Sequence, residues 1–162
     1  MIRVRAISPD DWRTWREIRL EALREAPEAF GSTLAEWQGN GDTEERWRRR
    51  LTDVPHNVVV ELDGRLAGTA GATHPTQGGD VDLISMWVAP FARGRGVGDA
   101  LVRSVVAWAQ DRGARSVSLC VMDGNANAIE LYARHGFVDT GIDVVLCRNT
   151  GRERRMTLKF RP

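Results

Sequence analysis

The sequence predicts a mixed α/β domain, in which strands and amphipathic helices alternate along one chain. Apolar residues switch repeatedly between the two-residue spacing of strands and the three- and four-residue spacing of helices. Gly, Pro and Asp–Gly signals separate these runs, and neither an internal repeat nor a Pro/Gly/Ser-rich linker divides the chain. We therefore expect a single domain, 1–162, long enough to bury a sizeable core.

The first third of the chain predicts one strand followed by helices. Residues 2–7 alternate apolar and basic side chains, as a half-buried strand does. Ser8 and Pro9 then form a helix start, and the helix should end near residue 26. Two shorter helices are expected at 33–37 and 43–51, the second capped by its first residue, a threonine. The four arginines of 43–51 should be mostly solvated, as clustered charges usually are.

The remaining sequence predicts six more strands and two helices. The strands are expected at 57–62, 65–72, 80–88, 116–122, 137–147 and 153–160. The helices are expected at 100–109 and at 125–135, where Gly136 follows at the C′ position. Asp63–Gly64 should form a hairpin turn, and 148–151 a polar turn between the last two strands. Gly68 and Gly71, inside a strand, indicate a bulge or a close backbone contact.

The rest of the chain is organised around residues 83–98, which read strand, glycine-rich turn, helix. A short apolar run ends at Pro90, and three glycines then alternate with two arginines. This order presents backbone N–H groups at a helix N-terminus, where an anion is favoured. Because the turn lacks Gly-Lys-Ser/Thr, and the last glycine of GxGxxG, it is neither a nucleotide-hydrolase nor a dinucleotide loop. We expect a phosphate cradle of another kind; the alternative is a glycine-rich turn with solvated arginines.

Two motifs resemble the signatures of the GNAT superfamily, the acyl-CoA-dependent N-acyltransferases. The first is Arg93-x-x-Gly96-x-Gly98, which is similar to the acyl-CoA pyrophosphate loop. The second is N-x-x-A-x-x-L-Y-x-x-x-G-F over residues 125–137. The resemblance is specific from about residue 82 to 141, and elsewhere it is only architectural. It implies a mixed, twisted sheet of about seven strands with helices on both faces.

The resemblance also implies an acyl-CoA site. In this fold two neighbouring strands, here 83–88 and 116–122, begin side by side and then splay apart. The first would offer its free backbone to pantetheine and to the thioester carbonyl at Met86, Trp87 and Val88. The pyrophosphate would lie against Arg93, Gly94, Arg95, Gly96, Val97 and Gly98. Asn125 would hold the pantetheine arm, and Asn127 either does the same or caps its helix.

Tyr132 is the residue that the resemblance assigns as general acid, donating a proton to the departing thiolate. The alternative is a core tyrosine packed beside Phe137. For the general base the sequence offers two acids, Asp82 near the start of its strand and Glu36 on the acceptor side, and either can equally be a surface carboxylate. We expect His135 to interact with the C-terminus of its own helix instead.

The family implies that the first helix, residues 30–37 and the last hairpin form the acceptor pocket. Phe30, Ser32 and Glu36 are its candidate residues, and Trp12, Trp15 and Trp37 either line it or belong to the core. The sequence shows no acidic concentration suited to a polycation. The expected acceptor is a small-molecule primary amine or a peptide N-terminus, with acetyl-CoA as co-substrate. A non-catalytic acyl-CoA-binding sensor of the same fold is the competing function.

Composition narrows the partners and the location. The 23 basic and 22 acidic residues nearly balance, which argues against nucleic-acid or membrane-surface binding. No apolar run approaches the roughly 20 residues that span a bilayer, and the first residues lack a signal-peptide pattern. Cys120 and Cys147 are expected to be buried thiols in a reducing compartment, which favours the cytoplasm. No metal site is expected, and dimerisation, common in the family, stays open.

Overall fold

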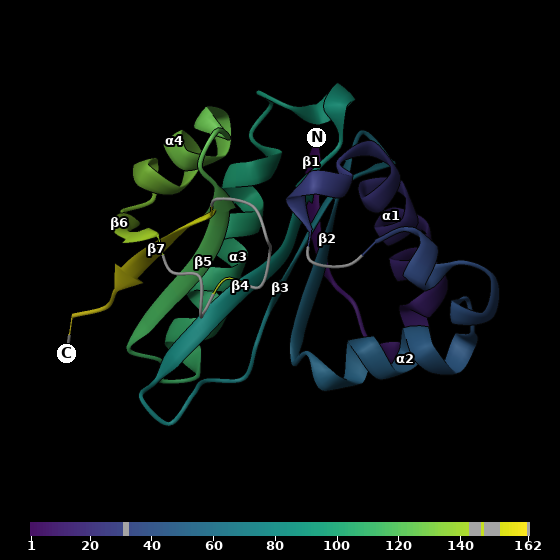
Figure 1. Cartoon of the computed structure of the whole chain (residues 1–162), viewed down its shortest axis with the longest axis horizontal. Helices are drawn as coiled ribbons and strands as arrows, with labels where there is room; N and C mark the ends of the chain where they lie inside the picture. Colours follow the sequence, from purple (N-terminus) through teal and green to yellow (C-terminus); the bar gives the residue numbers. More distant parts are fainter. Residues whose placement is uncertain (31–32, 143–146, 148–152, 162) are drawn as a thin grey trace.

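The computed structural model describes residues 1–30, 33–142, 147 and 153–161. It contains a seven-stranded mixed sheet in the order β1-β2-β3-β4-β5-β7-β6, with helices on both faces (Figure 1). The strands are β1 Ile2–Ala6, β2 His56–Leu62, β3 Arg65–Ala72, β4 Asp80–Val88, β5 Ser116–Met122, β6 Val138–Ile142 and β7 Glu153–Lys159. The α-helices are α1 Trp12–Glu25, α2 Glu44–Asp53, α3 Val97–Asp111 and α4 Ala126–Arg134. Short 3₁₀ helices are η1 Pro9–Asp11, η2 Pro27–Ala29, η3 Ala35–Trp37, η4 Gly39–Gly41 and η5 Pro90–Ala92.

The buried apolar residues form two clusters, one on each face of the sheet. Alternate residues of β2 belong to different clusters, Val58 and Val60 to one and Val59 to the other, because successive side chains of a strand point to opposite faces. The first cluster takes its helical residues from α3 and α4, and the second from α1 and α2. The sheet therefore separates an α3/α4 face from an α1/α2 face, as the family resemblance implies.

Most of the expected elements are present, and the departures have local causes. The expected helix at 33–37 is only the 3₁₀ turn η3, followed by η4, in which Gly39 has a left-handed φ of +59°. Helix α3 begins at residue 97 instead of 100, because Gly96, with φ +88°, serves as its N-cap. β1 is an edge strand and is less buried than expected, with Ile2 36% and Val4 43% exposed. Strand β6 is described over Val138–Ile142, and the continuation expected over 143–146, like the expected turn at 148–151, lies outside the described residues.

The two close-contact glycines of β3 behave as expected. A Cβ on Gly68 would lie 2.9 Å from both the carbonyl oxygen of Trp87 and Cγ1 of Val97. The missing side chain thus lets β3, β4 and the start of α3 approach each other closely. Next to Gly71 the β3–β4 register shifts, and opposite that shift Ser85 adopts a positive φ of 55°. Strand β4 therefore carries a bulge at its centre, where a non-glycine residue is held in a strained conformation.

Strands β4 and β5 pair only at their beginnings. Their parallel register runs from Asp80 with Ser116 to Asp82 with Ser118 and then stops. Beyond this point β5 remains paired with β7 along its whole length, while β4 remains paired only with β3. The backbone of the second half of β4 therefore has no strand partner on its β5 side within the described sheet, and this is the splay that the resemblance implies.

Candidate active site

The glycine loop 93–98 joins β4, through η5, to the N-terminus of α3. Gly94 and Gly96 have φ values of +75° and +88°, which a residue with a Cβ rarely adopts. The first bond of the helix runs from the amide of Ala100 to the carbonyl of Gly96, at 3.1 Å. The amides of 97–99 consequently have no partner within the helix. Such free amides and the helix dipole favour an anion at a helix N-terminus, and the strand, glycine turn and helix follow one another as predicted.

The two loop arginines are already paired with carboxylates. The Nη2 atom of Arg93 lies 3.0 and 2.9 Å from the two carboxylate oxygens of Glu25, and its Nε donates to the carbonyl of Val88 at 3.1 Å. Arg95 lies 3.7 Å from Asp63. Both guanidinium groups are half-exposed, 52% and 53%. Arg93 thus ties the loop to the end of α1 and to β4 while one side of its guanidinium faces solvent.

The predicted thioester strand presents its side chains to both cores and its backbone to the splay. Trp87 is 4% exposed in the α1/α2 core, and its Nε1 donates to Glu25 Oε2 at 2.8 Å. Met86 and Val88 pack on the α3/α4 core. Glu25 therefore anchors both this strand and Arg93, a positioning role that the sequence did not reveal.

Helix α4 is capped by Asn125, whose Oδ1 accepts from the amide of Ala128 at 3.3 Å. The prediction that Asn127 is the capping alternative is wrong, because Asn127 lies one residue inside the helix and is exposed. The Leu131 side chain of α4 packs closely on α3 at Gly98, where a Cβ would lie 2.9 Å from Cδ2 of Leu131. Gly98 thus brings together the two motifs that the sequence shows separately.

Tyr132 is buried on the inner side of α4, 5% exposed. Its ring lies beside Phe137, with centroids 6.0 Å apart. Among the described residues its hydroxyl has no hydrogen-bond partner. Burial raises the pKa of Tyr132 above the usual value for a phenol, so the hydroxyl keeps its proton at neutral pH.

His135 does not act as expected. It is the C-cap residue of α4, but its Nε2 lies 2.7 Å from Oδ1 of Asp99 in the first turn of α3. Arg134 donates to the same oxygen at 3.1 Å. The hydrogen bond from His135 is the largest cause that lowers the pKa of Asp99. We predicted that His135 interacts with the end of its own helix. The side chain of His135 instead forms a bridge between α4 and α3.

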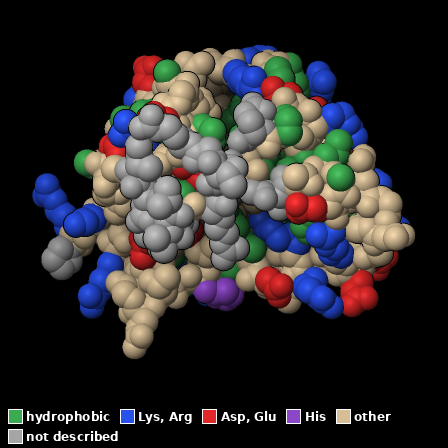
Figure 2. All heavy atoms as spheres, in the orientation of Figure 1, with side chains coloured by type: hydrophobic (Ala, Val, Ile, Leu, Met, Phe, Trp, Pro, Cys, Tyr) green, Lys and Arg blue, Asp and Glu red, His purple; other side chains and the backbone are tan. Residues whose placement is uncertain are grey.

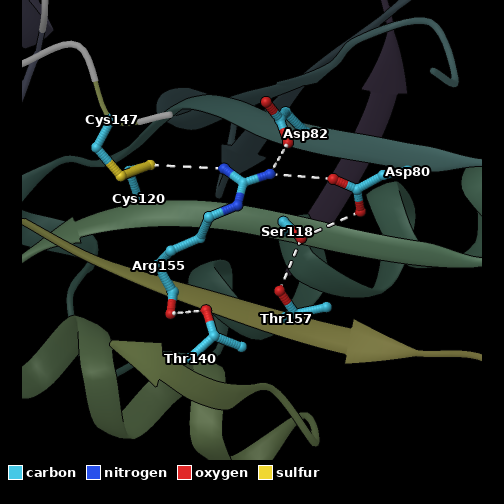
Figure 3. The surroundings of a disulfide bond; sticks show 8 residues. All are labelled: Asp80, Asp82, Ser118, Cys120, Thr140, Cys147, Arg155 and Thr157. Carbon is cyan, nitrogen blue, oxygen red and sulfur yellow. Dashed lines mark hydrogen bonds and ion pairs between the residues drawn. A yellow bond between two sulfur atoms is a disulfide. The ribbon is translucent and has the colours of Figure 1, made fainter. Parts of the chain in front are cut away.

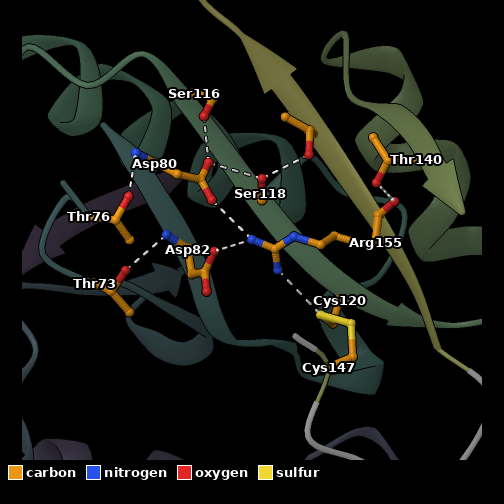
Figure 4. A network of polar contacts seen from close by, with 11 residues as sticks. Thr73, Thr76, Asp80, Asp82, Ser116, Ser118, Cys120, Thr140, Cys147 and Arg155 are labelled. Carbon is orange, nitrogen blue, oxygen red and sulfur yellow. Dashed lines mark hydrogen bonds and ion pairs between the residues drawn. A yellow bond between two sulfur atoms is a disulfide. The ribbon is translucent and has the colours of Figure 1, made fainter. Parts of the chain in front are cut away.

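Asp82, a candidate base, is held by an arginine at the start of the splay (Figure 3). The Nη2 atom of Arg155 in β7 lies 2.9 Å from Asp82 Oδ1 and 3.0 Å from Asp80 Oδ2. Ser118 donates to the other oxygen of Asp80 at 3.1 Å. The guanidinium therefore bridges the two aspartates of β4 across β5 (Figure 4). Asp82 is still 41% exposed, and its second oxygen is left for a water or a substrate.

The expectation of free thiols is wrong: Cys120 and Cys147 form a disulfide with a Cα–Cα distance of 5.7 Å (Figure 3). The two residues are 27 apart in sequence, and only the fold brings them together. Glu153 lies close enough to complete a group of three potential metal ligands. Since both sulfurs form the disulfide bond, neither is available as a thiolate ligand for a metal ion.

The acceptor-side candidates are only partly brought together. Glu36 lies on η3, and within the described residues its carboxylate forms no hydrogen bond or ion pair. Phe30 lies over the guanidinium of Arg19, 4.6 Å from the ring centroid. Ser32 lies outside the described residues. Trp15, 1% exposed, belongs to the core.

The expectation that the arginines of α2 are solvated is wrong for Arg50. Its Nη1 donates to Asn57 Oδ1 at 2.8 Å, and its Nη2 donates to Ser85 Oγ at 3.0 Å. Helix α2 packs on the sheet through Trp47 and Leu51, and Arg50 on the same helix reaches β2 and β4 instead of water.

The surface supplies little further information on partners. Two hollows of about 450 and 570 Å³ lie beside α2 and α1, and no described residue of β4 or β5 lines either of them. On the face drawn in Figure 2, the described basic and acidic side chains are interspersed instead of forming one broad patch. Among the described residues, no helix has the length and apolar character needed to cross a membrane.

Comparison with known proteins identifies the family. The acetyltransferase (GNAT) family model matches residues 12–137. Two relatives are a streptothricin acetyltransferase of Streptomyces lavendulae, 35% identical over 115 residues, and a mycothiol acetyltransferase of Cellulomonas flavigena, 31% identical over 154 residues. These matches cover 71% and 89% of this chain, and the chain spans only 61% and 42% of the two relatives.

A solved structure shows the same fold. The PaiA N-acetyltransferase of Thermoplasma acidophilum, in complex with coenzyme A, has a TM-score of 0.75 over 99% of each chain at 17% identity. The match to the family model covers both the glycine loop at the start of α3 and the α4 motif. The chain belongs to the acetyltransferase (GNAT) family.

Proposed function

We propose that this protein transfers an acetyl group from acetyl-CoA to the primary amine of a small molecule or of a peptide N-terminus. The observation that carries the proposal is the opening between β4 and β5, which lies next to the anion-binding end of α3. An extended chain with amide groups can pair with a free strand edge, and a diphosphate suits free helical amides. One ligand chemistry, that of an acyl-CoA, combines both features.

The residues present fit the two ends of such a ligand. The amides of 97–99 and the exposed sides of Arg93 and Arg95 would take the pyrophosphate. The open backbone of Met86, Trp87 and Val88 would orient the pantetheine arm, with Asn125 beside it. When bound, acetyl-CoA supplies an acetyl group that is activated as a thioester.

Two groups of this chain would then assist the transfer: a backbone N–H would stabilise the developing negative charge, and a side chain would supply a proton. A backbone N–H of β4 aimed at the thioester oxygen would stabilise the negative charge that develops there, an effect commonly worth about 3–4 kcal/mol. Tyr132 would donate its proton to the departing sulfur. Burial raises the pKa of Tyr132, so its proton is present at neutral pH, and the role is supported by the place of Tyr132 in the family motif and not by this shift, which weakens the phenol as an acid.

For the general base we propose Asp82, acting through its second oxygen or through a water. Arg155 holds the first oxygen, so the carboxylate is fixed in orientation, and the side chain, at the last paired position of β4 and β5, is still 41% exposed. Glu36, exposed on η3, is the alternative from the acceptor side.

The test of the function is a thermal-shift titration with acetyl-CoA, with ATP and NAD as controls. A ligand at a hundredfold excess over its Kd stabilises by about 2.7 kcal/mol, on the order of 5–10 °C for a chain of this size. We expect this shift with acetyl-CoA alone. A larger shift with ATP, or none with acetyl-CoA, would contradict the proposal.

The competing function, a non-catalytic acyl-CoA sensor, predicts the same thermal shift but no turnover. Release of free CoA in the presence of a panel of primary amines separates the two functions. An enzyme releases CoA only with its amine acceptor, whereas a sensor releases none with any of them.

A further inference from the structure

On the α1/α2 face a buried arginine, Arg19, and a partly buried one, Arg50, have no carboxylate partner among the described residues. Arg19 in α1 is 7% exposed, and its Nη1 is buried without a hydrogen bond. The guanidinium of Arg19 is in contact only with aromatic rings, those of Trp15 at 5.9 Å and Phe30 at 4.6 Å from the centroids. Arg50 in α2 also lies over Trp15, at 4.7 Å, and hydrogen-bonds only to neutral groups, Asn57 and Ser85. Among the described residues, neither arginine forms an ion pair.

The two charges also repel each other. Burial, followed by the charge of Arg50, lowers the pKa of Arg19 to about 10. Burial likewise lowers the pKa of Arg50 to about 10, and the charge of Asp53 opposes this shift without forming an ion pair. Both side chains remain cationic at neutral pH. A buried charge without a partner is costly, and such a cost usually marks a site where a ligand supplies the missing charge.

The position of the pair connects it to the proposed reaction centre. Arg50 donates to Ser85, the residue of β4 with positive φ, and Met86 of the proposed thioester site follows it directly. The same arginine lines the surface hollow of about 450 Å³ beside α2, together with Arg46 and Arg49. Phe30, half-buried, covers Arg19. A ligand reaching this pair would thus approach β4 from the face opposite α3 and α4.

We propose that Arg19 and Arg50 bind the carboxylate of the acetyl acceptor, and that the acceptor is therefore a small amine that carries a carboxylate, such as a free amino acid. The inference rests on the proposed acetyltransferase function and names its substrate class. The guanidinium fork matches the two oxygens of a carboxylate. The two bonds from Arg50 Nη1 and Nη2 use two of its five N–H donors, so both arginines keep donors for the two oxygens of a carboxylate.

The first test compares free amino acids with their C-terminal amides as acceptors. Free CoA is measured with saturating acetyl-CoA for alanine, leucine, phenylalanine and glutamate, each beside its α-amide, and for ethanolamine beside phosphoethanolamine. Converting the carboxylate to an amide lowers the pKa of the amine and raises the fraction of free amine at neutral pH, so a preference for the acids points to recognition of the carboxylate. We expect kcat/KM to be about 10- to 100-fold higher for at least one acid than for its amide. Equal use of both forms, or a preference for phosphoethanolamine, overturns the inference.

The second test uses Arg19→Met and Arg50→Met, with Arg24→Met as the matched control on the exposed side of α1. Methionine keeps the apolar stem of the side chain and removes the charge. Each of the first two variants should raise KM for the preferred acid about 10- to 100-fold. Arg19→Met should leave kcat/KM for the amide within about threefold, whereas Arg50→Met, which also loses the hydrogen bond to Ser85, should lower the acid-to-amide ratio of kcat/KM about 10-fold or more. Arg24→Met should change neither. Equal losses for acid and amide indicate a structural role and overturn the inference.

Stability gives an independent readout. Removing an unpartnered buried charge is neutral or stabilising, so the Tm of Arg19→Met should equal or exceed that of the parent. A lower Tm would mean that Arg19 has a structural role. The acetyl-CoA thermal shift should be unchanged in all three variants. If the parent itself shows no such shift, the proposed function fails; if the shift is present and the acids are not preferred, only the acceptor assignment fails.

Discussion

At the scale of single residues, Tyr132 is the side chain that combines burial, a raised pKa and a place in the family motif. The same burial is also what a core tyrosine would show, so position alone does not separate catalysis from packing. Removing the hydroxyl distinguishes the two roles. Because the hydroxyl has no hydrogen-bond partner among the described residues, a phenylalanine at this position should pack as well as the tyrosine does.

Tyr132→Phe should therefore lower kcat by about 10²- to 10⁴-fold and leave the Tm and the acetyl-CoA thermal shift unchanged. The rate is measured by the release of free CoA, and the Tm and the acetyl-CoA shift are measured by thermal melts. Turnover at the parental rate would remove Tyr132 from the mechanism. A fall in Tm of several degrees would indicate a structural role instead.

The interaction between Asp42 and Arg16 should make the free energy of unfolding sensitive to acid. Arg16 approaches its two oxygens at 2.7 and 2.5 Å, and this hydrogen bonding, followed by that of Trp47, lowers the pKa of Asp42 from 3.8 to about 2. A lowered folded-state pKa gives stability that is present above pH about 4 and lost as pH falls towards 2.

Asp42→Asn should thus cost about 1–2 kcal/mol of unfolding free energy at pH 7, and the difference from the parent should vanish near pH 2. Urea unfolding at several pH values measures it. Asp10→Asn is the control, because Asp10 is 90% exposed in its pair with Arg48. A difference between Asp42→Asn and the parent that persists at pH 2 would contradict the assignment.

At the scale of elements, the glycine loop and its neighbours show how small residues set the distances between strand and helix. Gly68 brings β3 against β4 and α3, whereas Gly98 brings α3 against α4. The obstacles differ in kind, since a Cβ at Gly68 meets a backbone carbonyl and a Cβ at Gly98 meets the end of a leucine side chain.

Gly68→Ala should consequently destabilise by about 1–3 kcal/mol, as overpacking does, and Gly98→Ala by less, since Leu131 can move. Gly124→Ala, with nothing within 4 Å of the added Cβ, is the neutral control. Urea unfolding ranks the three variants. If Gly68→Ala and Gly124→Ala were equally stable, the proposed close contact between β3 and β4 would be absent in solution.

At the scale of the whole molecule, the disulfide closes a long segment between β5 and the residues preceding β7. A sequence separation of 27 residues corresponds to about 3–4 kcal/mol of loop-closure entropy. We expect the Tm of the parent to fall by several degrees in a thiol reductant, while the Tm of a Cys120→Ser/Cys147→Ser variant is insensitive to it. A parent that melts at the same temperature with and without reductant would contradict the crosslink.

The sequence alone determined the features that neighbouring residues control. The threonine cap of α2, the Asp63–Gly64 turn and the C′ glycine after α4 each depend on the backbone preference of one or two residues, and all three are found where predicted. Apolar spacing likewise located the seven strands, and within the described residues their ends differ from the predicted ones by one residue at most.

Only the tertiary structure decided which distant residues meet. Arg155 reaches Asp82 across 73 positions, Cys120 bonds to Cys147, His135 bonds to Asp99, and Arg50 donates to Ser85. Sheet order and the packing of helices on the sheet, and not spacing along the chain, create these contacts. A residue's partners in three dimensions depend on long-range packing, so the predictions of free thiols and of a solvated Arg50 were wrong, while most turn and cap predictions, which depend on neighbouring residues, were confirmed.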